Sequence, residues 1–150
     1  MQKSFEARPF RYLLKPTSFE EFENAFLSAY KYVLNMTRKY IEYQYKKKFY
    51  KIPIQNVLYF ESRKRKIMIV TPNFIGTMYA KLSEMEDVLK QNVEYFVRVH
   101  QSFLVNYLHI QVHANQYIIM DNGIVIPISE EKRKSVRKDL QNSKDVVYIN

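Results

Sequence analysis

The chain has 150 residues and a mass of 18.2 kDa, with 47% hydrophobic and 15% aromatic residues, so it can bury one hydrophobic core and a small appended element. The absence of cysteine excludes disulfides and thiol chemistry, and three histidines spread over positions 100 to 113 disfavour a zinc site. The sequence contains neither a run of about 18 apolar residues nor a secretory signal pattern, so we expect a cytoplasmic protein that is not exported and does not enter a membrane.

The charge is unevenly distributed. The formal net charge is +9, from 24 Lys+Arg against 15 Asp+Glu; residues 1–36 hold five basic and four acidic side chains, which leaves 19 and 11 for residues 37–150. A basic domain attracts polyanions and releases their counterions on binding, which favours nucleic acid or an anionic membrane surface as partner. Solubility alone would also account for such a charge.

The N-terminal part reads as a strand followed by a helix. Residues 9–16 form a short apolar run closed by a Lys-Pro pair, and Ser18 can cap a helix whose Glu21 reaches back to it. Apolar positions then recur at three- and four-residue intervals to about Met36: Phe19, Phe22, Phe26, Ala29, Tyr30 and Val33. A lone strand and helix cannot bury that face, so it must pack on the rest of the chain, on a second copy or on a missing segment.

From Tyr40 onward the pattern alternates, which is typical of strands. A hairpin is expected around Lys46–Lys48, and Leu82–Leu89 is the one clear helical patch. Residues 129–140 are charged and compatible with another short helix; the apolar run Val146–Ile149 has no evident place. We expect strands at residues 40–45, 49–52, 54–61, 67–71, 74–80, 108–112, 117–120 and 124–127.

One stretch combines a strand pattern with a polar interruption. Phe96–Asn106 carries His100, Gln101 and Ser102 in its middle, which a buried strand would not need, so we expect a loop tip held in the core by Val97, Val99, Phe103 and Val105. Gln can pair with adenine in bidentate fashion, and His and Ser can meet bases or phosphates. His100 could instead be a hydrogen-bonded histidine at a strand end, but its neighbour Arg98 favours a binding surface.

A second basic segment consists of Arg63, Lys64, Arg65 and Lys66, between two strand-like runs and therefore on a turn. Such a turn is either a solvated face or a contact to phosphates and guanine bases, and composition does not decide between them. Catalysis finds little support, because no Gly-x-Ser-x-Gly elbow, paired histidines or glycine-rich phosphate loop is present. We expect neither an enzyme nor a cofactor.

Four blocks in order resemble the LytTR DNA-binding domain, the effector half of LytR/AlgR-class bacterial response regulators. Residues 54–62 are similar to that family's I-D-I-x-Y-x-E opening, and residues 82–89 to its helix. Residues 96–106 with Ile110 match its most recognisable run, and Gly123 with residues 126–129 matches its end, so that the resemblance covers about residues 38–140.

The resemblance implies a mainly β fold, an elongated stack of small antiparallel sheets with one short helix, here preceded by the N-terminal amphipathic helix. It also implies transcriptional regulation through loops inserted in successive major grooves of double-stranded DNA with direct-repeat sites. Carried over by motif, the major-groove contacts are Arg63, Lys64, Arg65 and Lys66, and Arg98, His100, Gln101 and Ser102. A third contact, in the minor groove, falls on Lys132 and Arg133, where this chain departs from the family by placing Glu130 and Glu131 first.

Residues 10–16 and the following helix resemble the last strand and helix of a receiver domain, in which Lys15 would face the phosphoryl group. We therefore expect residues 1–37 to be a receiver remnant and linker, and residues 38–150 to be the DNA-binding domain. Since the rest of a receiver would lie upstream, the chain is expected to be a fragment without its own phosphorylation site. An upstream kinase matters only if a full receiver is present, and the bared helix face predicts a homodimer, formed through that helix or on DNA.

One alternative remains at this point. The same basic loops would serve a protein-interaction module or a module for an anionic membrane surface, without specific DNA readout. The two differ in whether a duplex with paired repeats binds more tightly than a scrambled one.

Overall fold

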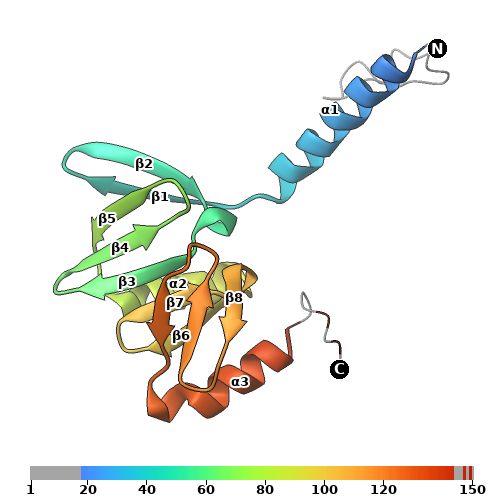
Figure 1. The fold of residues 1–150 in the computed structure, drawn as a ribbon. Helices are drawn as coiled ribbons and strands as arrows, with labels where there is room; N and C mark the ends of the chain where they lie inside the picture. Colours follow the sequence, from blue (N-terminus) through green and yellow to red (C-terminus); the bar gives the residue numbers. More distant parts are fainter. Residues whose placement is uncertain (1–17, 144–146, 148, 150) are drawn as a thin grey trace. The chain divides into compact units, whose positions relative to one another are not determined.

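The computed structural model describes residues 18–143, 147 and 149, and it divides the chain into two compact units, residues 1–39 and 40–150 (Figure 1). Each unit is described by itself. The strand expected at residues 9–16, with Lys15, lies outside the described residues, as does part of Val146–Ile149. No helix in the described part of the chain is long and apolar enough to cross a membrane.

The first unit contains helix α1, Phe19–Thr37, close to its predicted bounds. The Ser18 hydroxyl accepts a hydrogen bond from the Glu21 N–H at 3.1 Å, so the predicted cap is confirmed. The apolar face is exposed: Phe19 is 77%, Phe22 52% and Phe26 60% accessible.

In its described residues the second unit holds three antiparallel sheets and two short α-helices, which confirms the predicted mainly β class. The sheets have the strand orders β1-β2, β5-β4-β3-β7-β6 and β10-β9-β8. The strands are β1 Tyr40–Tyr45, β2 Lys48–Pro53, β3 Tyr59–Arg63, β4 Lys66–Val70, β5 Ile75–Tyr79, β6 Phe96–His100, β7 Phe103–Asn106, β8 Ile110–His113, β9 Tyr117–Met120 and β10 Val125–Pro127. The helices are α2 Leu82–Asn92 and α3 Arg133–Gln141, the latter an addition to the one clearly predicted.

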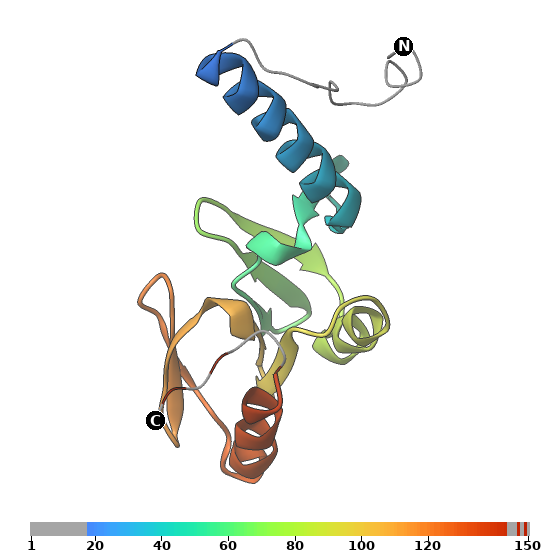
Figure 2. The same cartoon turned by 90° about the vertical axis from the view of Figure 1, so that its right-hand side faces the viewer.

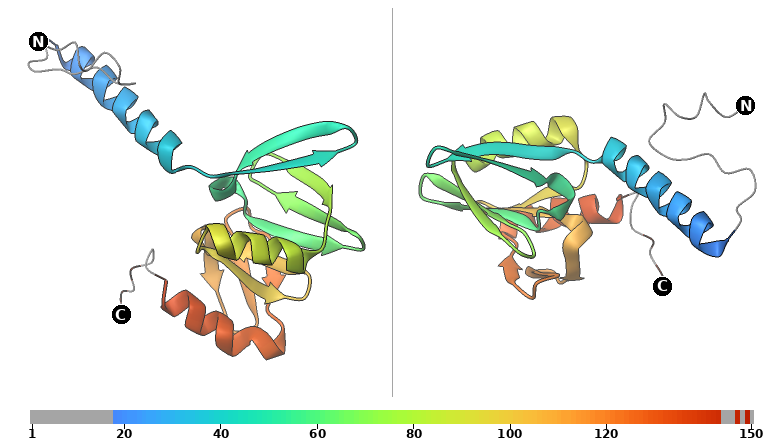
Figure 3. Two further views of the ribbon diagram at one scale, coloured as in Figure 1. Left: turned by 180° about the vertical axis from the view of Figure 1, so that it is seen from behind. Right: turned by 90° about the horizontal axis from the view of Figure 1, so that it is seen from above.

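The five-stranded sheet is buried on both faces. Because side chains alternate along a strand, Phe60 and Leu104 point to one face, where they pack with the β1–β2 hairpin and α2 (Figure 3). Their neighbours Tyr59 and Val105 point to the other face, against the three-stranded sheet and α3 (Figure 2). Two hydrophobic clusters therefore fix the central sheet, and its turns project from a rigid support.

Two predicted strands begin later than expected, and one buried residue explains both. Residues 54–56 form a short 3-10 helix, so the strand predicted at 54–61 is wrong in its first half, and residues 107–109 form another. Asn106 is fully buried; its amide donates to the Val57 carbonyl at 3.0 Å and accepts from the Leu108 N–H at 2.9 Å. This side chain thus binds main-chain groups that a neighbouring strand would otherwise pair.

Candidate nucleic-acid interface

The turn between β6 and β7 is shorter than predicted. His100 still pairs with Phe103 at the end of β6, after a bulge that follows Arg98, so Gln101 and Ser102 alone form the turn. Val97, Val99 and Val105 are buried beneath it and Phe103 is half-buried, as expected for a loop tip held by the core. The bulge bends the end of β6 and so changes the direction in which the turn residues project.

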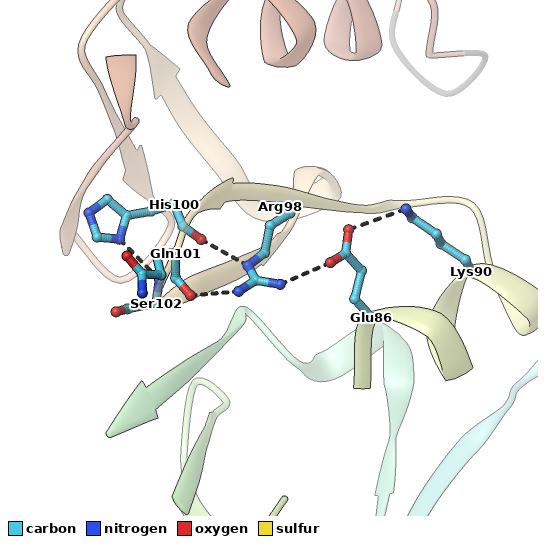
Figure 4. Close-up of polar contacts among 6 residues, drawn as sticks. All are labelled: Glu86, Lys90, Arg98, His100, Gln101 and Ser102. Carbon is cyan, nitrogen blue, oxygen red and sulfur yellow. Dashed lines mark hydrogen bonds and ion pairs between the residues drawn. The ribbon is translucent and has the colours of Figure 1, made fainter. Parts of the chain in front are cut away.

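Arg98 is held between this turn and helix α2 (Figure 4). Its guanidinium donates to the His100 carbonyl at 2.9 Å and the Gln101 carbonyl at 2.6 Å, and it forms an ion pair with Glu86 at 2.9 Å. The Arg98 side chain is only 17% accessible, and Glu86 also binds Lys90 at 3.2 Å. The arrangement uses the Arg98 donors to fix the backbone of the turn, which favours a positioning role.

The hydrogen-bond pattern also defines the tautomer of His100. The Ser102 N–H can only donate, and it lies 3.0 Å from His100 Nδ1, so Nδ1 is the acceptor and the neutral ring carries its proton on Nε2. The ring packs edge-on against Phe103 with centroids 5.7 Å apart. The half-buried imidazole therefore offers a fixed N–H donor, while the neighbouring Gln101 side chain is exposed.

The basic segment at Arg63–Lys66 is divided between two strands and their turn. Arg63 belongs to β3 and pairs with Glu61 at 3.0 Å; the hydrogen bond to this carboxylate raises the pKa of Arg63. Lys66 belongs to β4, with its ammonium 5.5 Å from the centre of the Tyr79 ring. Lys64 and Arg65 form the exposed turn, and Lys64 has a left-handed backbone with φ 58°.

The two turns lie side by side. The Ser62 N–H donates to the Ser102 carbonyl at 2.8 Å, and a groove of about 540 Å³ lies between the turns. Its polar and charged lining comes from three segments: Ser62, Lys64, Arg65, Lys81, Ser83, Glu84, Arg98, Gln101 and Ser102. Cations outnumber the single carboxylate, and Glu84 is tied back to the Lys81 N–H at 3.2 Å. The surface is therefore suited to an anionic chain.

The third predicted segment lies beside the end of β6 but does not line this groove. The Ser129 N–H donates to the Val99 carbonyl at 2.9 Å, one residue before His100. Lys132 and Arg133 are half-buried, and Arg133 donates to the Ile128 carbonyl at 3.3 Å. Glu130 and Glu131 are exposed next to them, so this segment presents both signs of charge.

Sequence reasoning missed Lys81 and Glu86. Lys81 precedes α2 and enters the groove only because the helix packs beside the two turns. In the sequence, Glu86 has the spacing of an ordinary helix ion pair, because Lys90 follows it by four residues. No local pattern indicates its contact with Arg98. Within the described residues no group of three or more His, Asp or Glu side chains could hold a metal ion.

Comparisons with known proteins identify the family of the second unit. A family model described as the LytTr DNA-binding domain matches residues 47–141. A solved structure described as the LytTr DNA-binding domain of a methyl-accepting/DNA response regulator from Bacillus cereus is 27% identical, with a TM-score of 0.59, over 67% of this chain and 95% of that chain. A comparison with curated proteins gave no match. Since the family model spans more than half of the chain, the resemblance is confirmed for this part: the chain belongs to the LytTr DNA-binding domain family.

Proposed function

We propose that this chain binds double-stranded DNA sequence-specifically and regulates transcription as the effector part of a cytoplasmic two-component response regulator. One observation supports this most: the main-chain hydrogen bond from Ser62 to Ser102 holds the basic β3–β4 turn and the polar β6–β7 turn side by side at one cationic groove. Two projecting turns on a rigid sheet can enter grooves of a duplex without a recognition helix.

Base reading falls to the β6–β7 turn. The exposed amide of Gln101 has the donor and acceptor that pair with adenine N7 and N6, and the Nε2–H of His100 can donate to guanine O6 or N7. Ser102 can serve a base edge or a phosphate. Arg98 acts on the same bases indirectly, by fixing the carbonyls of His100 and Gln101.

The β3–β4 turn serves the neighbouring major groove. Lys64 and Arg65 are exposed and have no ion-pair partner among residues 18–143, whereas the charge of Arg63 is partly neutralised by Glu61 and Lys66 lies over Tyr79. The minor-groove contact is assigned to Lys132 and Arg133. It is the weakest of the three, because the carboxylates of Glu130 and Glu131 repel phosphates.

The N-terminal unit supports an assembly role. We propose that residues 1–37 are the end of a receiver domain and that residues 38–150 bind DNA. The exposed Phe19, Phe22 and Phe26 then join two chains, so that one dimer carries two DNA-binding domains. An upstream sensor kinase acts on this regulator only where a full receiver is present.

The test begins with selection of bound duplexes from a random pool. We expect paired direct repeats, and tighter binding of these than of scrambled duplexes at moderate salt. Gln101→Ala should reduce that discrimination by about 1–3 kcal/mol, since one bidentate contact is lost. Gln111→Ala, an exposed glutamine on β8, is the matched control and should leave discrimination intact.

Two results would contradict the proposal. One is equal affinity for repeat and scrambled duplexes in the unaltered protein. The other is binding to anionic lipid vesicles at the same salt that competes with the duplex and exceeds it in affinity, which would favour a membrane-surface module.

A further inference from the structure

The β1–β2 turn has a backbone that its residues do not favour. Tyr45 pairs with Lys48, which leaves Lys46 and Lys47 as a two-residue turn with φ of 51° and 64°. Two successive left-handed residues are the geometry of a type I′ turn, usually Asn-Gly, because a β-carbon is strained there. Lysine lacks the short polar side chain that relieves this strain, so local folding does not explain its presence at both positions.

Charge adds to this strain. Lys46, Lys47 and Lys48 are consecutive and exposed, and none of them forms an ion pair within residues 18–143. The Lys46 ammonium lies 5.5 Å from the centre of its neighbouring Tyr45 ring. Strain and like-charge repulsion at one surface turn indicate a use outside the fold, since strained backbone clusters at sites that bind or switch.

An aromatic row connects this turn to the proposed DNA-binding surface. The Tyr45 and Tyr79 rings are 5.6 Å apart, and Tyr79 carries the Lys66 ammonium at 5.5 Å. The β1–β2 turn and the β3–β4 turn project at the same end of the unit (Figure 1), a relation also visible from behind (Figure 3). A cation stands at each end of this pair of rings, because Lys46 lies over Tyr45 and Lys66 lies over Tyr79.

We propose that Lys46–Lys48 hold backbone phosphates of the same duplex, outside the groove occupied by the β3–β4 turn. This inference rests on the proposed DNA binding. Lysine ammonium groups act as point charges on phosphates and carry no sequence information. Successive phosphates of one strand lie about 3.4 Å apart along the helix axis. The Tyr45 and Tyr79 rings separate the β1–β2 turn from the β3–β4 turn, so the β1–β2 turn reaches phosphates a few nucleotides beyond those at the β3–β4 turn.

The variant Lys46→Asn/Lys47→Gly tests this inference by separating stability from binding. Because Asn-Gly suits the type I′ turn, the midpoint of urea unfolding should rise. Affinity should fall by about fivefold per lost contact at 0.15 M salt, equally on repeat and scrambled duplexes. The slope of log affinity against log salt concentration should become shallower by about 0.9 per lost contact. Lys46→Arg/Lys47→Arg keeps the charge and should keep the affinity.

A matched control uses one lysine from each unit. Lys47→Gln should weaken binding and flatten the salt dependence, whereas Lys31→Gln on α1 removes the same charge from outside the proposed DNA-binding domain and should change neither. Equal weakening by both would show a general charge effect and overturn the inference.

The outcomes separate this inference from the proposed function. If the unaltered protein does not prefer repeats, the proposed function fails. If it prefers repeats but Lys46→Asn/Lys47→Gly keeps full affinity and salt slope, only the turn contact is overturned. Loss confined to the repeat duplex would also contradict it, since that result would assign base reading to this turn.

Discussion

Asn106 shows how one buried polar side chain determines the local fold. It lies at the end of β7 and satisfies the Val57 carbonyl and the Leu108 N–H, two main-chain groups 49 and two residues away from it in the sequence. Its own N–H donates to the Leu58 carbonyl at 2.9 Å. The side-chain amide therefore connects the segment before β3 to the segment after β7, next to the strands that carry the two turns proposed to bind DNA.

Asn106→Ala should destabilise the second unit by about 3 kcal/mol, because it leaves a buried carbonyl and a partly buried N–H without partners. Urea unfolding followed by circular dichroism measures the change. Asn73→Ala, an exposed asparagine in the turn before β5, is the control and should stay within about 0.5 kcal/mol. A change at Asn106 no larger than at Asn73 would contradict this role.

At the scale of elements, helix α2 supports the β6–β7 turn through a single ion pair. Glu86 on α2 holds Arg98, and Arg98 holds two carbonyls of the turn. The helix thus contributes to the placement of Gln101 in the proposed complex.

Glu86→Ala separates two roles for Arg98. If Arg98 positions the turn, the variant should reduce the preference for repeat over scrambled duplex several-fold, since the guanidinium loses its anchor. If Arg98 contacts DNA itself, as the motif alone predicts, freeing it and removing a carboxylate should strengthen binding instead. Lys90→Ala is the matched control: Lys90 binds the same carboxylate, is 68% accessible and does not reach the turn. Electrophoretic mobility shifts with both duplexes measure the difference.

Local pattern predicted most elements of the second unit, because strand alternation and turn residues are encoded within a few neighbours. It failed at residues 54–58, where the Asn106 amide binds from a distant segment, and at residues 107–109, where the same amide caps a 3-10 helix. Long-range contacts of this kind leave no periodic signal. The partner of Arg98 was missed for the same reason, and the left-handed backbone at Lys46 and Lys47 cannot be read from residue types that usually avoid it.

At the scale of the whole molecule, α1 is expected to govern assembly. Its exposed face of Phe19, Phe22 and Phe26 is not buried within the described residues. Phe22→Glu/Phe26→Glu should convert a dimer to a monomer in sedimentation, because two charges would have to be buried at the contact. Ser28→Glu, on another side of the same helix, should leave the dimer intact. A monomer at high concentration in the unaltered protein would instead favour a receiver segment as the normal cover of this face.

The hydrogen bond between Ser62 and Ser102 has a consequence for how such a regulator can change its targets. Both partners are main-chain groups, so every substitution except proline at position 62 leaves the donor and the acceptor in place. Under the proposed function, replacing residues at the two turns would alter which bases are preferred, while the spacing between the two contacted grooves would stay the same. Related regulators would then differ in the base sequence of their operators sooner than in the spacing of the contacted grooves.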